Sequence, residues 1–243
     1  MGRRPLRSRS AASALVVLLL LPMLAACSGG GGDRSAALVP QPGEPVVTVM
    51  DFSRPLPLDP PPPGWWHRQF WTRRPMDIGF AEKDGVPAIR LATRGSASML
   101  FRHVDVPLAG YPVLAWRWYV ERPIDSPIDE RTHDGDDHPA RIFLTFAGPG
   151  DARKSMEIIW GNKVLHAGGT KVIGGFPHYV ANGGNENVGR WHAEHVDLRE
   201  LTHRFWPDQS FDRLIDVALF CDSDETHTAS VAYFADVKLE RAP

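Results

Sequence analysis

Short runs in which apolar and polar residues alternate recur along most of the chain, with turn-forming residues between them. A period of two residues is typical of β-strands, because successive side chains of a strand point to opposite faces of a sheet. The runs with this pattern are 46–52, 86–93, 98–106, 112–120, 139–147, 155–160, 190–196, 214–222 and 230–240. Many short strands separated by turns predict an all-β fold, a jelly-roll-like antiparallel β-sandwich, rather than alternating strands and helices.

The run 112–120 shows the two faces of a predicted strand most clearly. One face consists of Leu114, Trp116, Trp118 and Val120, and the other carries Arg117. An entirely apolar face is expected to pack in the core of the sandwich. The opposite face, with its cationic residue, is the candidate for a binding surface.

One segment has the features of a helix. Asp197 can cap the first turn, Glu200 stands three positions later as in a capping box, and Pro207 follows the segment. The apolar residues with helical spacing are Leu198, Leu201 and Phe205. We therefore expect one short helix over 198–206 that covers an edge of the sandwich.

The N-terminal segment has the three parts of a secretory signal peptide: four arginines, a largely apolar run over 11–24, and small residues. The apolar run is too short for a membrane-spanning helix, which needs about 18 residues or more. Its end, Leu24-Ala25-Ala26-Cys27, resembles the lipobox of bacterial lipoproteins. The resemblance implies that residues 1–26 are removed and that lipidated Cys27 anchors the protein to the membrane. An ordinary signal peptide with a chance cysteine is the alternative.

The residue after the cysteine, Ser28, indicates the membrane to which the lipoprotein is sorted. By resemblance to the sorting of bacterial lipoproteins, it implies the periplasmic face of the outer membrane. Residues 27–45 are rich in glycine and then in proline, with no apolar periodicity, which predicts a flexible tether. The remaining residues, 46–243, are expected to form a single β-sandwich domain, since one core commonly spans this length.

A proline-rich stretch interrupts the predicted strands early in the domain. Residues 60–63 are all proline and predict a stiff, extended connector. We expect Trp65 and Trp66, which follow it, to lie in a loop packed over the rim of the sandwich.

Composition and net charge limit the classes of binding partner that are expected. The four arginines of segment 1–26 leave with it, which lowers 27 basic residues to 23 against 29 acidic ones and shifts the net charge from −2 to −6. An acidic protein is a poor match for nucleic acid. The only cysteines are Cys27 and Cys221, so lipidation of Cys27 leaves no intramolecular disulfide. Cys221 lies in an apolar run and is expected to be a small buried side chain.

Common catalytic signatures are absent from the sequence. It contains no G-x-S-x-G elbow, no H-E-x-x-H zinc motif and no G-x-x-x-x-G-K-[ST] phosphate loop. Their absence lowers the expectation of a serine hydrolase, a zinc protease or a nucleotide-dependent enzyme. It favours a binding protein and leaves the question of catalysis open.

The densest polar cluster stands directly before a predicted strand. It runs from His133 to His138, includes Asp134, Asp136 and Asp137, and precedes Arg141. Carboxylates this close repel one another unless an arginine or a cation compensates them. The cluster is therefore a turn held by arginine salt bridges, a cation site, or a site of acid–base chemistry. Loops at strand ends often carry function, which makes this cluster the leading candidate site.

Two further clusters combine tryptophan with amide and charged residues. One runs from Glu157 through Trp160 to Asn162, and the other runs from Asn182 to Trp191. An aromatic face can stack on a sugar ring while polar groups bind its hydroxyls, so these residues suit a saccharide. Tryptophan in a core and Asn-Gly in a turn are the structural alternatives.

The two ends of the predicted domain suggest a metal. The segments around Asp51 and Asp236 resemble the terminal strands of galactose-binding-like jelly rolls, which often carry a structural calcium ion. The resemblance implies calcium as the one candidate cofactor, with Asp51 and Asp236 as ligands. Ordinary carboxylates at strand ends are the alternative.

In order along the chain, several motifs from about residue 46 to residue 239 resemble the bacterial domain-of-unknown-function family 3047. They are Ala115-Trp116-Arg117-Trp118, Gly135-Asp136-Asp137, the strand from Arg141 to Phe146, Trp160-Gly161-Asn162, Gly189-Arg190-Trp191, and the stretch Asp222-Ser223-Asp224-Glu225-Thr226 before Tyr233. The resemblance implies an exported β-rich domain and supplies no established activity. It nominates one face or rim with Arg117, Asp136, Asp137, Arg141, Trp160, Asn162, Trp191, Asp222 and Asp224, to which the polar cluster adds His138.

The sequence thus predicts a lipoprotein of the cell envelope that is anchored in a membrane. Its sandwich is expected to bind a saccharide or another envelope polymer. A polysaccharide lyase or glycosidase that uses Asp and His residues near Asp136 is one alternative. A scaffold protein that binds a protein partner is the other.

Overall fold

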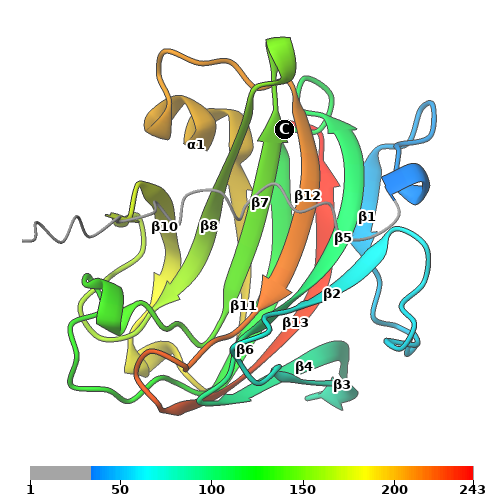
Figure 1. Ribbon diagram of the computed structural model, residues 1–243. Coiled ribbons are helices and arrows are strands. Elements are labelled where there is room, and N and C mark those ends of the chain that lie inside the picture. The colour runs from blue at the N-terminus through cyan, green and yellow to red at the C-terminus, as the bar shows by residue number, and fades with distance from the viewer. Residues whose placement is uncertain (1–33, 243) are drawn as a thin grey trace, which may run out of the picture. The chain divides into compact units, whose positions relative to one another are not determined.

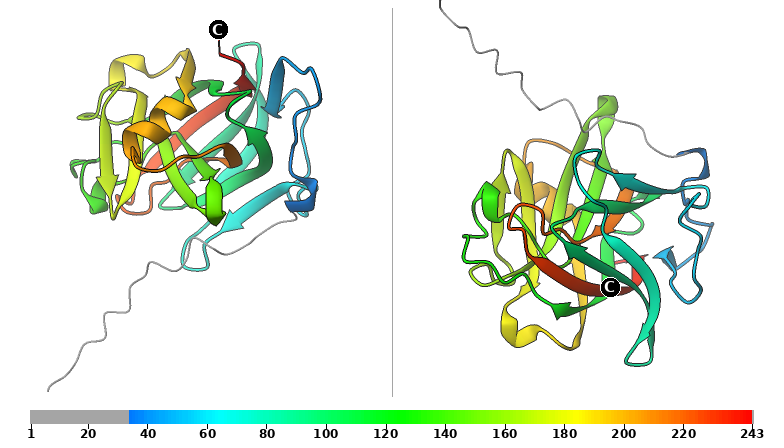
Figure 2. Two further views of the ribbon diagram at one scale, coloured as in Figure 1. Left: turned by 90° about the horizontal axis from the view of Figure 1, so that it is seen from above. Right: turned by 60° about the horizontal axis from the view of Figure 1, so that its bottom comes forward.

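A computed structural model describes residues 34–242 of the chain, and within them two β-sheets pack face to face (Figure 1). The six-stranded sheet contains β1 (Val46–Met50), β3 (Asp77–Lys83), β4 (Val86–Arg94), β6 (Val113–Arg122), β11 (Trp191–Asp197) and β13 (Ala229–Glu240). Its order is β11-β6-β13-β4-β3, with β1 paired to β13. The pairing of β1 with β13 brings the two ends of the domain together within this sheet (Figure 2).

The seven-stranded sheet lies toward the viewer in Figure 1. It contains β2 (Trp65–Gln69), β5 (Ser98–Pro107), β7 (Arg141–Ala147), β8 (Arg153–Gly161), β9 (Thr170–Ile173), β10 (Phe176–Gly183) and β12 (Arg213–Phe220). Its order is β2-β5-β12-β7-β8-β10-β9. The predicted all-β sandwich is confirmed, and each predicted run contains a strand whose bounds differ by no more than two residues.

Alternation sorts the side chains between the core and the outer surfaces. Leu114, Trp116, Trp118 and Val120 of β6 are buried in the core, as the sequence predicts. Ile142, Leu144 and Phe146 of β7 enter the same core from the other sheet. The residues between them, such as Arg117 and Phe143, therefore point to the outer sides of the sandwich.

Four strands lie outside the predicted runs: β2, β3, β9 and β10. The segment with Trp65 and Trp66, predicted as a loop, forms the edge strand β2. The sandwich is also not purely antiparallel, because β10 runs parallel to β8, with His178 opposite Glu157. Alternation of apolar and polar residues does not predict β10, because glycines precede this strand and Pro177 lies within it.

The predicted helix is confirmed as α1 (Leu198–Phe205). The Asp197 carboxylate accepts hydrogen bonds from the backbone N–H groups of Arg199 (2.8 Å) and Glu200 (3.2 Å). These bonds satisfy two of the free N–H groups of the first turn. Leu198 and Leu201 are buried against the sandwich, and α1 follows β11 directly. Four short 3-10 turns complete the described elements: η1 (Arg34–Ala36), η2 (His133–Gly135), η3 (Pro149–Asp151) and η4 (Asn185–Asn187).

The segment 34–45 corrects the predicted extent of the tether, because it is attached to the sandwich. The backbone N–H of Leu38 donates to the carbonyl oxygen of His103 (3.0 Å), and the N–H of Asp105 donates to the carbonyl oxygen of Leu38 (2.8 Å). Arg34 also forms an ion pair with Asp216 (2.9 Å). Free N–H and C=O groups at the edge of β5 provide the physical reason for this docking.

The N-terminal predictions, including the signal peptide 1–26 and Cys27, lie outside the described residues. Within residues 34–242, no helix has the length and apolarity needed to cross a membrane. Cys221 is a free, buried thiol, as predicted, and burial raises its pKa.

Candidate functional site

The outer face of the seven-stranded sheet, meaning the side turned away from the six-stranded sheet, carries a line of aromatic side chains. The strand register places Trp66 of β2 opposite Phe101 of β5, and Ala218 of β12 between Phe101 and Phe143 of β7. Phe176 of β10 continues the line. We call Trp66, Phe101, Phe143 and Phe176 the aromatic row.

The rings of the aromatic row contact one another in sequence. The ring centroids of Trp66 and Phe101 lie 5.2 Å apart, and those of Phe101 and Phe143 lie 5.6 Å apart. The rings of Phe143 and Phe176 are stacked, with centroids at 5.8 Å and an interplanar angle of 10°. Phe101 is buried, whereas Trp66, Phe143 and Phe176 are partly exposed, so the row presents aromatic surface to solvent.

Charged side chains continue the same line across the sheet. Phe143 lies opposite Glu157 of β8, and Glu157 lies opposite His178 of β10. Glu157 and His178 are both buried. The His178 Nε2 atom lies 3.1 Å from an Arg141 nitrogen, while its Nδ1 atom is buried without a hydrogen-bond partner among the described residues.

Arg141, which begins β7, is the centre of the charged group. Only 3% of it is exposed. Its guanidinium donates to a carboxylate oxygen of Glu157 (2.6 Å) and of Asp222 (2.6 Å), and it lies 3.6 Å from the Asp136 carboxylate. Burial alone would lower the pKa of Arg141, but these three carboxylates outweigh it and raise the pKa well above its ordinary value. We call Arg141, Asp136, Glu157 and Asp222 the Arg141 cluster.

The pKa values of the carboxyl groups in the Arg141 cluster are shifted in opposite directions. Burial would raise the pKa of Asp136 and of Glu157, but Arg141 and the neighbouring histidines outweigh burial, so both pKa values are lowered. For the Asp222 carboxyl, burial dominates over Arg141, and its pKa is raised well above the ordinary value. Asp136 and Glu157 are therefore held as carboxylates at neutral pH.

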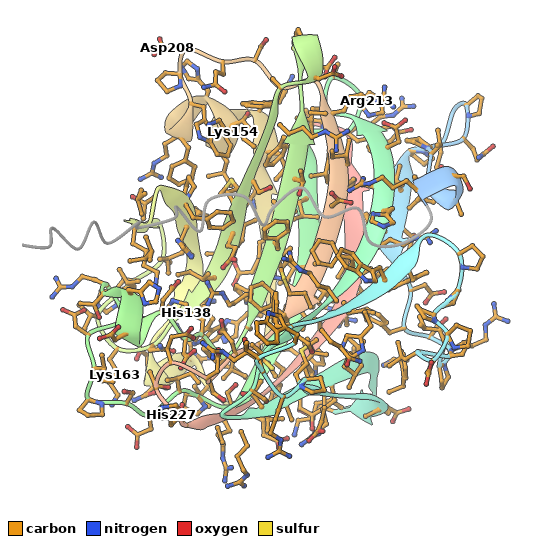
Figure 3. All side chains as sticks on the ribbon, in the orientation of Figure 1. His138, Lys154, Lys163, Asp208, Arg213 and His227 are labelled. Carbon is orange, nitrogen blue, oxygen red and sulfur yellow. The ribbon has the colours of Figure 1, made fainter. Side chains whose placement is uncertain are left out.

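His138 lies beside this cluster and is fully buried. Its Nδ1 lies 2.9 Å from the carbonyl oxygen of Trp160, and its Nε2 lies 2.8 Å from the Lys171 ammonium. An ammonium can only donate, so Nε2 accepts and Nδ1 carries the proton. Burial first, and then the Lys171 charge, lower the pKa of His138 to about 4. Figure 3 shows His138 toward the same end of the sandwich as Lys163 and His227, away from Lys154 and Arg213.

Glu130 fixes the loop that follows β8. Its buried carboxylate accepts hydrogen bonds from the backbone N–H groups of Asn162 (2.6 Å), Lys163 (2.8 Å) and Leu165 (2.8 Å). Gly161 permits the fold of this loop, since a Cβ there would lie 2.2 Å from the carbonyl oxygen of Leu165. Glu130 is thus a positioning residue at this end of the sheet.

A second group of carboxylates lies next to the Arg141 cluster. Asp137, Asp222, Asp224 and Glu225 each offer an oxygen, and these atoms all lie within 4.8 Å of one another. Burial, followed by the neighbouring carboxyl groups of Asp137, Asp224 and Asp222, raises the pKa of Glu225 to about 9. We call these four residues the carboxylate cluster.

The structure brings most of the predicted site residues together. Those that gather at this end of the seven-stranded sheet are Asp136, Asp137, His138, Arg141, Asn162, Asp222 and Asp224. The Asn162 side chain, for example, donates to the carbonyl oxygen of Asp137 (2.7 Å). Pairing of β12 with β7 causes the convergence, because it places Phe220, and therefore Asp222, beside Arg141.

Three predicted residues do not join this site, which corrects the expectation of one shared face. Trp160 has no exposed surface and packs in the core, because its position on β8 has the parity of the buried residues. Arg117 and Trp191 lie on the outer side of the six-stranded sheet, at the opposite surface of the sandwich. There the Arg117 guanidinium stands 5.6 Å from the centre of the Trp191 ring.

The predicted calcium ligands Asp51 and Asp236 are not members of the carboxylate cluster. Asp51 accepts a hydrogen bond from the backbone N–H of Ser53 (2.8 Å). Asp236 forms an ion pair with Arg117 (2.5 Å). Each therefore has a local partner, which is the ordinary role of a carboxylate at a strand end.

Several residues of the site escape the sequence analysis. They are the four members of the aromatic row together with Glu130, Lys171 and His178, while Glu225 stands in the family motif at 222–226 but is not among the nominated site residues. Phe143 has a usable signal, because it alternates with the core residues Ile142 and Leu144 and so must face outward. The others lie on strands without clear alternation or in loops, where the sequence alone gives no neighbours.

The fold and this site define a β-sandwich with an aromatic and charged outer face. The model of a family described as "protein of unknown function (DUF3047)" matches residues 63–171 and 174–238, and the chain belongs to this family. No curated protein matches the chain.

A search of solved structures found chains to which this chain is similar. A family 30 carbohydrate-binding module has a TM-score of 0.45 and 9% identity, with 82% of this chain and 88% of that chain covered. The family 30 module of a cellulosomal cellulase from Clostridium thermocellum has a TM-score of 0.43 and 10% identity, with 81% and 97% covered. The xyloglucanase domain of a type three effector from Sinorhizobium fredii has a TM-score of 0.41 and 9% identity, with 74% and 94% covered.

Proposed function

We propose that the outer face of the seven-stranded sheet binds a saccharide chain. The observation that carries this proposal is the aromatic row, which crosses the strands instead of following one of them. Successive ring centroids lie 5.2, 5.6 and 5.8 Å apart, so the row extends for at most about 17 Å. A linear ligand of several sugar units could lie along this line, with its rings against the partly exposed aromatic side chains.

The polar end of the line supports the same proposal. Saccharides present many hydroxyl groups, which need donors and acceptors held in fixed positions. Arg141, Glu157 and His178 are fixed by their mutual contacts at the end of the aromatic row. The buried Nδ1 atom of His178 has no partner among the described residues, and a ligand hydroxyl would supply one.

The lowered pKa values of Asp136 and Glu157 favour binding over proton donation at these two groups, whereas the raised pKa of Asp222 is the one feature of the Arg141 cluster that would suit a general acid. A glycosidase needs a carboxylic acid that keeps its proton until it donates it to the leaving group. The lowered pKa values of Asp136 and Glu157 keep both groups ionised at neutral pH. These carboxylates suit hydrogen bonding to hydroxyl groups better than proton donation.

The proposal is tested by removing one ring from the row and one ring from the opposite surface. Phe143→Ala should weaken binding of a linear glycan about tenfold, because a ring contact contributes up to about 1.5 kcal/mol beyond area burial. Trp191→Ala is the matched control and should leave binding unchanged. Isothermal titration calorimetry with cellohexaose and with soluble peptidoglycan fragments measures both variants.

Three outcomes would count against the proposal. If Trp191→Ala abolished binding while Phe143→Ala preserved it, the site would lie on the six-stranded sheet. If the unaltered chain bound neither probe, a protein partner would become the better hypothesis. Release of new reducing ends during the incubation would identify an enzyme.

We further propose that Cys27 carries a lipid anchor and that the protein lies at the periplasmic face of the outer membrane. The lipobox-like sequence and Ser28 support this proposal. The six residues between Cys27 and Arg34 can extend for at most about 22 Å. The saccharide face would then operate close to the membrane surface.

Replacing Cys27 tests the anchor directly. The Cys27→Ala variant should move from the membrane fraction to the soluble periplasmic fraction, because no lipid can be attached. Immunoblots of fractionated cells measure the distribution, with Cys221→Ala as the matched cysteine control that stays with the membrane. Retention of Cys27→Ala in the membrane fraction would refute the anchor.

A further inference from the structure

The carboxylate cluster joins two segments that are far apart in the sequence. Asp137 lies in the loop before β7, whereas Asp222, Asp224 and Glu225 lie in the segment after β12. The four side chains offer oxygens within 4.8 Å of one another. None of these residues belongs to the aromatic row, so the saccharide proposal does not account for them.

Asp137 has one carboxylate oxygen that is buried without a hydrogen-bond partner among the described residues. The residue has no exposed surface. Its Oδ2 atom accepts hydrogen bonds from the backbone N–H of Thr226 (2.6 Å) and from the Thr226 hydroxyl (2.5 Å). Its Oδ1 atom is buried and has no hydrogen-bond partner among residues 34–242. A buried carboxylate oxygen without a partner is strongly unfavourable, so this atom indicates a ligand.

The basic side chains nearby do not balance the four carboxyl groups. Arg141 forms an ion pair with Asp222, but it also forms ion pairs with Glu157 and Asp136, so its charge is shared. Arg73 contacts Asp224 closely and lies 3.8 Å from Glu225, and its side chain is 45% exposed. In the described part of the chain, no basic group lies within ion-pair distance of Asp137. Ionised together, the four carboxyl groups would therefore carry an excess of negative charge, which like-charge repulsion makes unfavourable without a cation.

We propose that Asp137, Asp222, Asp224 and Glu225 bind a hard divalent cation of the calcium class. All four donors are oxygens, which calcium prefers, and they come from loop segments that can adapt to its variable coordination. The bound cation ties the loop around Asp137 to the segment 222–226, beside the Arg141 cluster. It therefore holds the end of the seven-stranded sheet at which the polar part of the proposed saccharide site lies.

Calcium binding by the full chain tests this proposal without any saccharide. After treatment with EDTA, calorimetric titration with CaCl2 should show saturable binding. At a hundredfold excess over Kd, calcium should raise Tm by about 5 to 10 °C. MgCl2 should bind more weakly, because magnesium requires a small octahedral site and loses its water reluctantly.

A paired set of variants locates the bound ion. The double variant Asp224→Asn with Glu225→Gln should lose calcium binding and the calcium-dependent rise in Tm. The side chains of Asp224 and Glu225 are 8% and 24% exposed, and the amide replacements keep their size, so the variant is expected to fold; its unfolding transition in EDTA checks this. Asp134→Asn is the matched control, because its carboxylate lies in the same loop as Asp137 but is 86% exposed; this variant should bind as the unaltered chain does.

Each contrary result is decisive. A folded chain that shows neither heat of binding nor a change in Tm with calcium would overturn the proposal, leaving the carboxyl groups to share protons. Calcium binding that is unchanged in the double variant would place the ion elsewhere. Magnesium binding as tight as calcium binding would overturn the assignment to the calcium class. If the double variant does not fold, the single variant Glu225→Gln takes its place, and undiminished calcium affinity there would overturn the proposal.

Discussion

The Arg141→Met variant should have a free energy of unfolding about 3 to 5 kcal/mol lower than that of the unaltered chain. The guanidinium contacts three carboxylates at once, and Glu157 and Asp222 are both buried. Removal of the arginine leaves these groups in a site without their main compensating charge. Urea unfolding at pH 7, followed by tryptophan fluorescence, measures the change.

The matched control for Arg141 is Arg117→Met. Arg117 forms an ion pair with one carboxylate, Asp236, whose side chain is 53% exposed. Exposed pairs contribute about 1 kcal/mol or less, so this variant should be nearly as stable as the unaltered chain. Equal losses for both variants would show that the Arg141 cluster has no special role in stability.

The effect of Arg141→Met should also depend on pH in a defined direction. In the unaltered chain, the lowered pKa values of Asp136 and Glu157 contribute stability that is present above the unfolded pKa values of 3.8 and 4.5 and is lost as the pH falls below them. The variant has less of this stability to lose, because its buried carboxylates take up protons more readily. The difference between the two proteins should therefore shrink as the pH is lowered from about 5 to about 2.

Replacing Trp160 should be about as damaging as replacing Arg141, for a different reason. Trp160 has no exposed surface, and its ring lies 5.6 Å from Trp118 and 5.3 Å from His192. Truncation of a fully buried tryptophan to alanine leaves a cavity and lowers the free energy of unfolding by about 3 to 5 kcal/mol. Equilibrium denaturation of Trp160→Ala measures this loss.

The chain provides a sharp control for this second prediction. Trp71 is 98% exposed, so Trp71→Ala should change the free energy of unfolding by less than about 0.5 kcal/mol. A stable Trp160→Ala variant that no longer bound a glycan would contradict the assignment of Trp160 to the core. It would restore the sequence-based interpretation of this residue as a ligand contact.

Alternation predicts those strands that bury one face and leave the other more exposed. In β6 and β7, apolar residues recur at every second position, and the structure buries them. The same signal cannot predict β10, because that strand follows two glycines, contains Pro177 and buries residues on both of its faces. It also cannot predict β2, whose two adjacent tryptophans do not alternate with polar residues.

The candidate site shows a similar division. The sequence places Asp136, Asp137 and His138 directly before the strand that begins at Arg141. An ion-pair network is one of the three arrangements expected of carboxylates next to an arginine, and Arg141 lies 3.6 Å from the Asp136 carboxylate. The sequence cannot show that Asp222 completes the network, because Arg141 and Asp222 are 81 positions apart and only the pairing of β7 with β12 brings them together.

The sequence by itself determined the all-β class, the position of most strands, the capped helix and the membership of the polar cluster before β7. These features depend on residues that are neighbours in the chain, so their pattern is visible in it. The tertiary structure alone decided that Trp66, Phe143 and Phe176 form one row and that Arg117 and Trp191 lie on the other surface. Strand order and register determine those relations, and they result from the packing of the whole sandwich, in which residues distant in the sequence become neighbours.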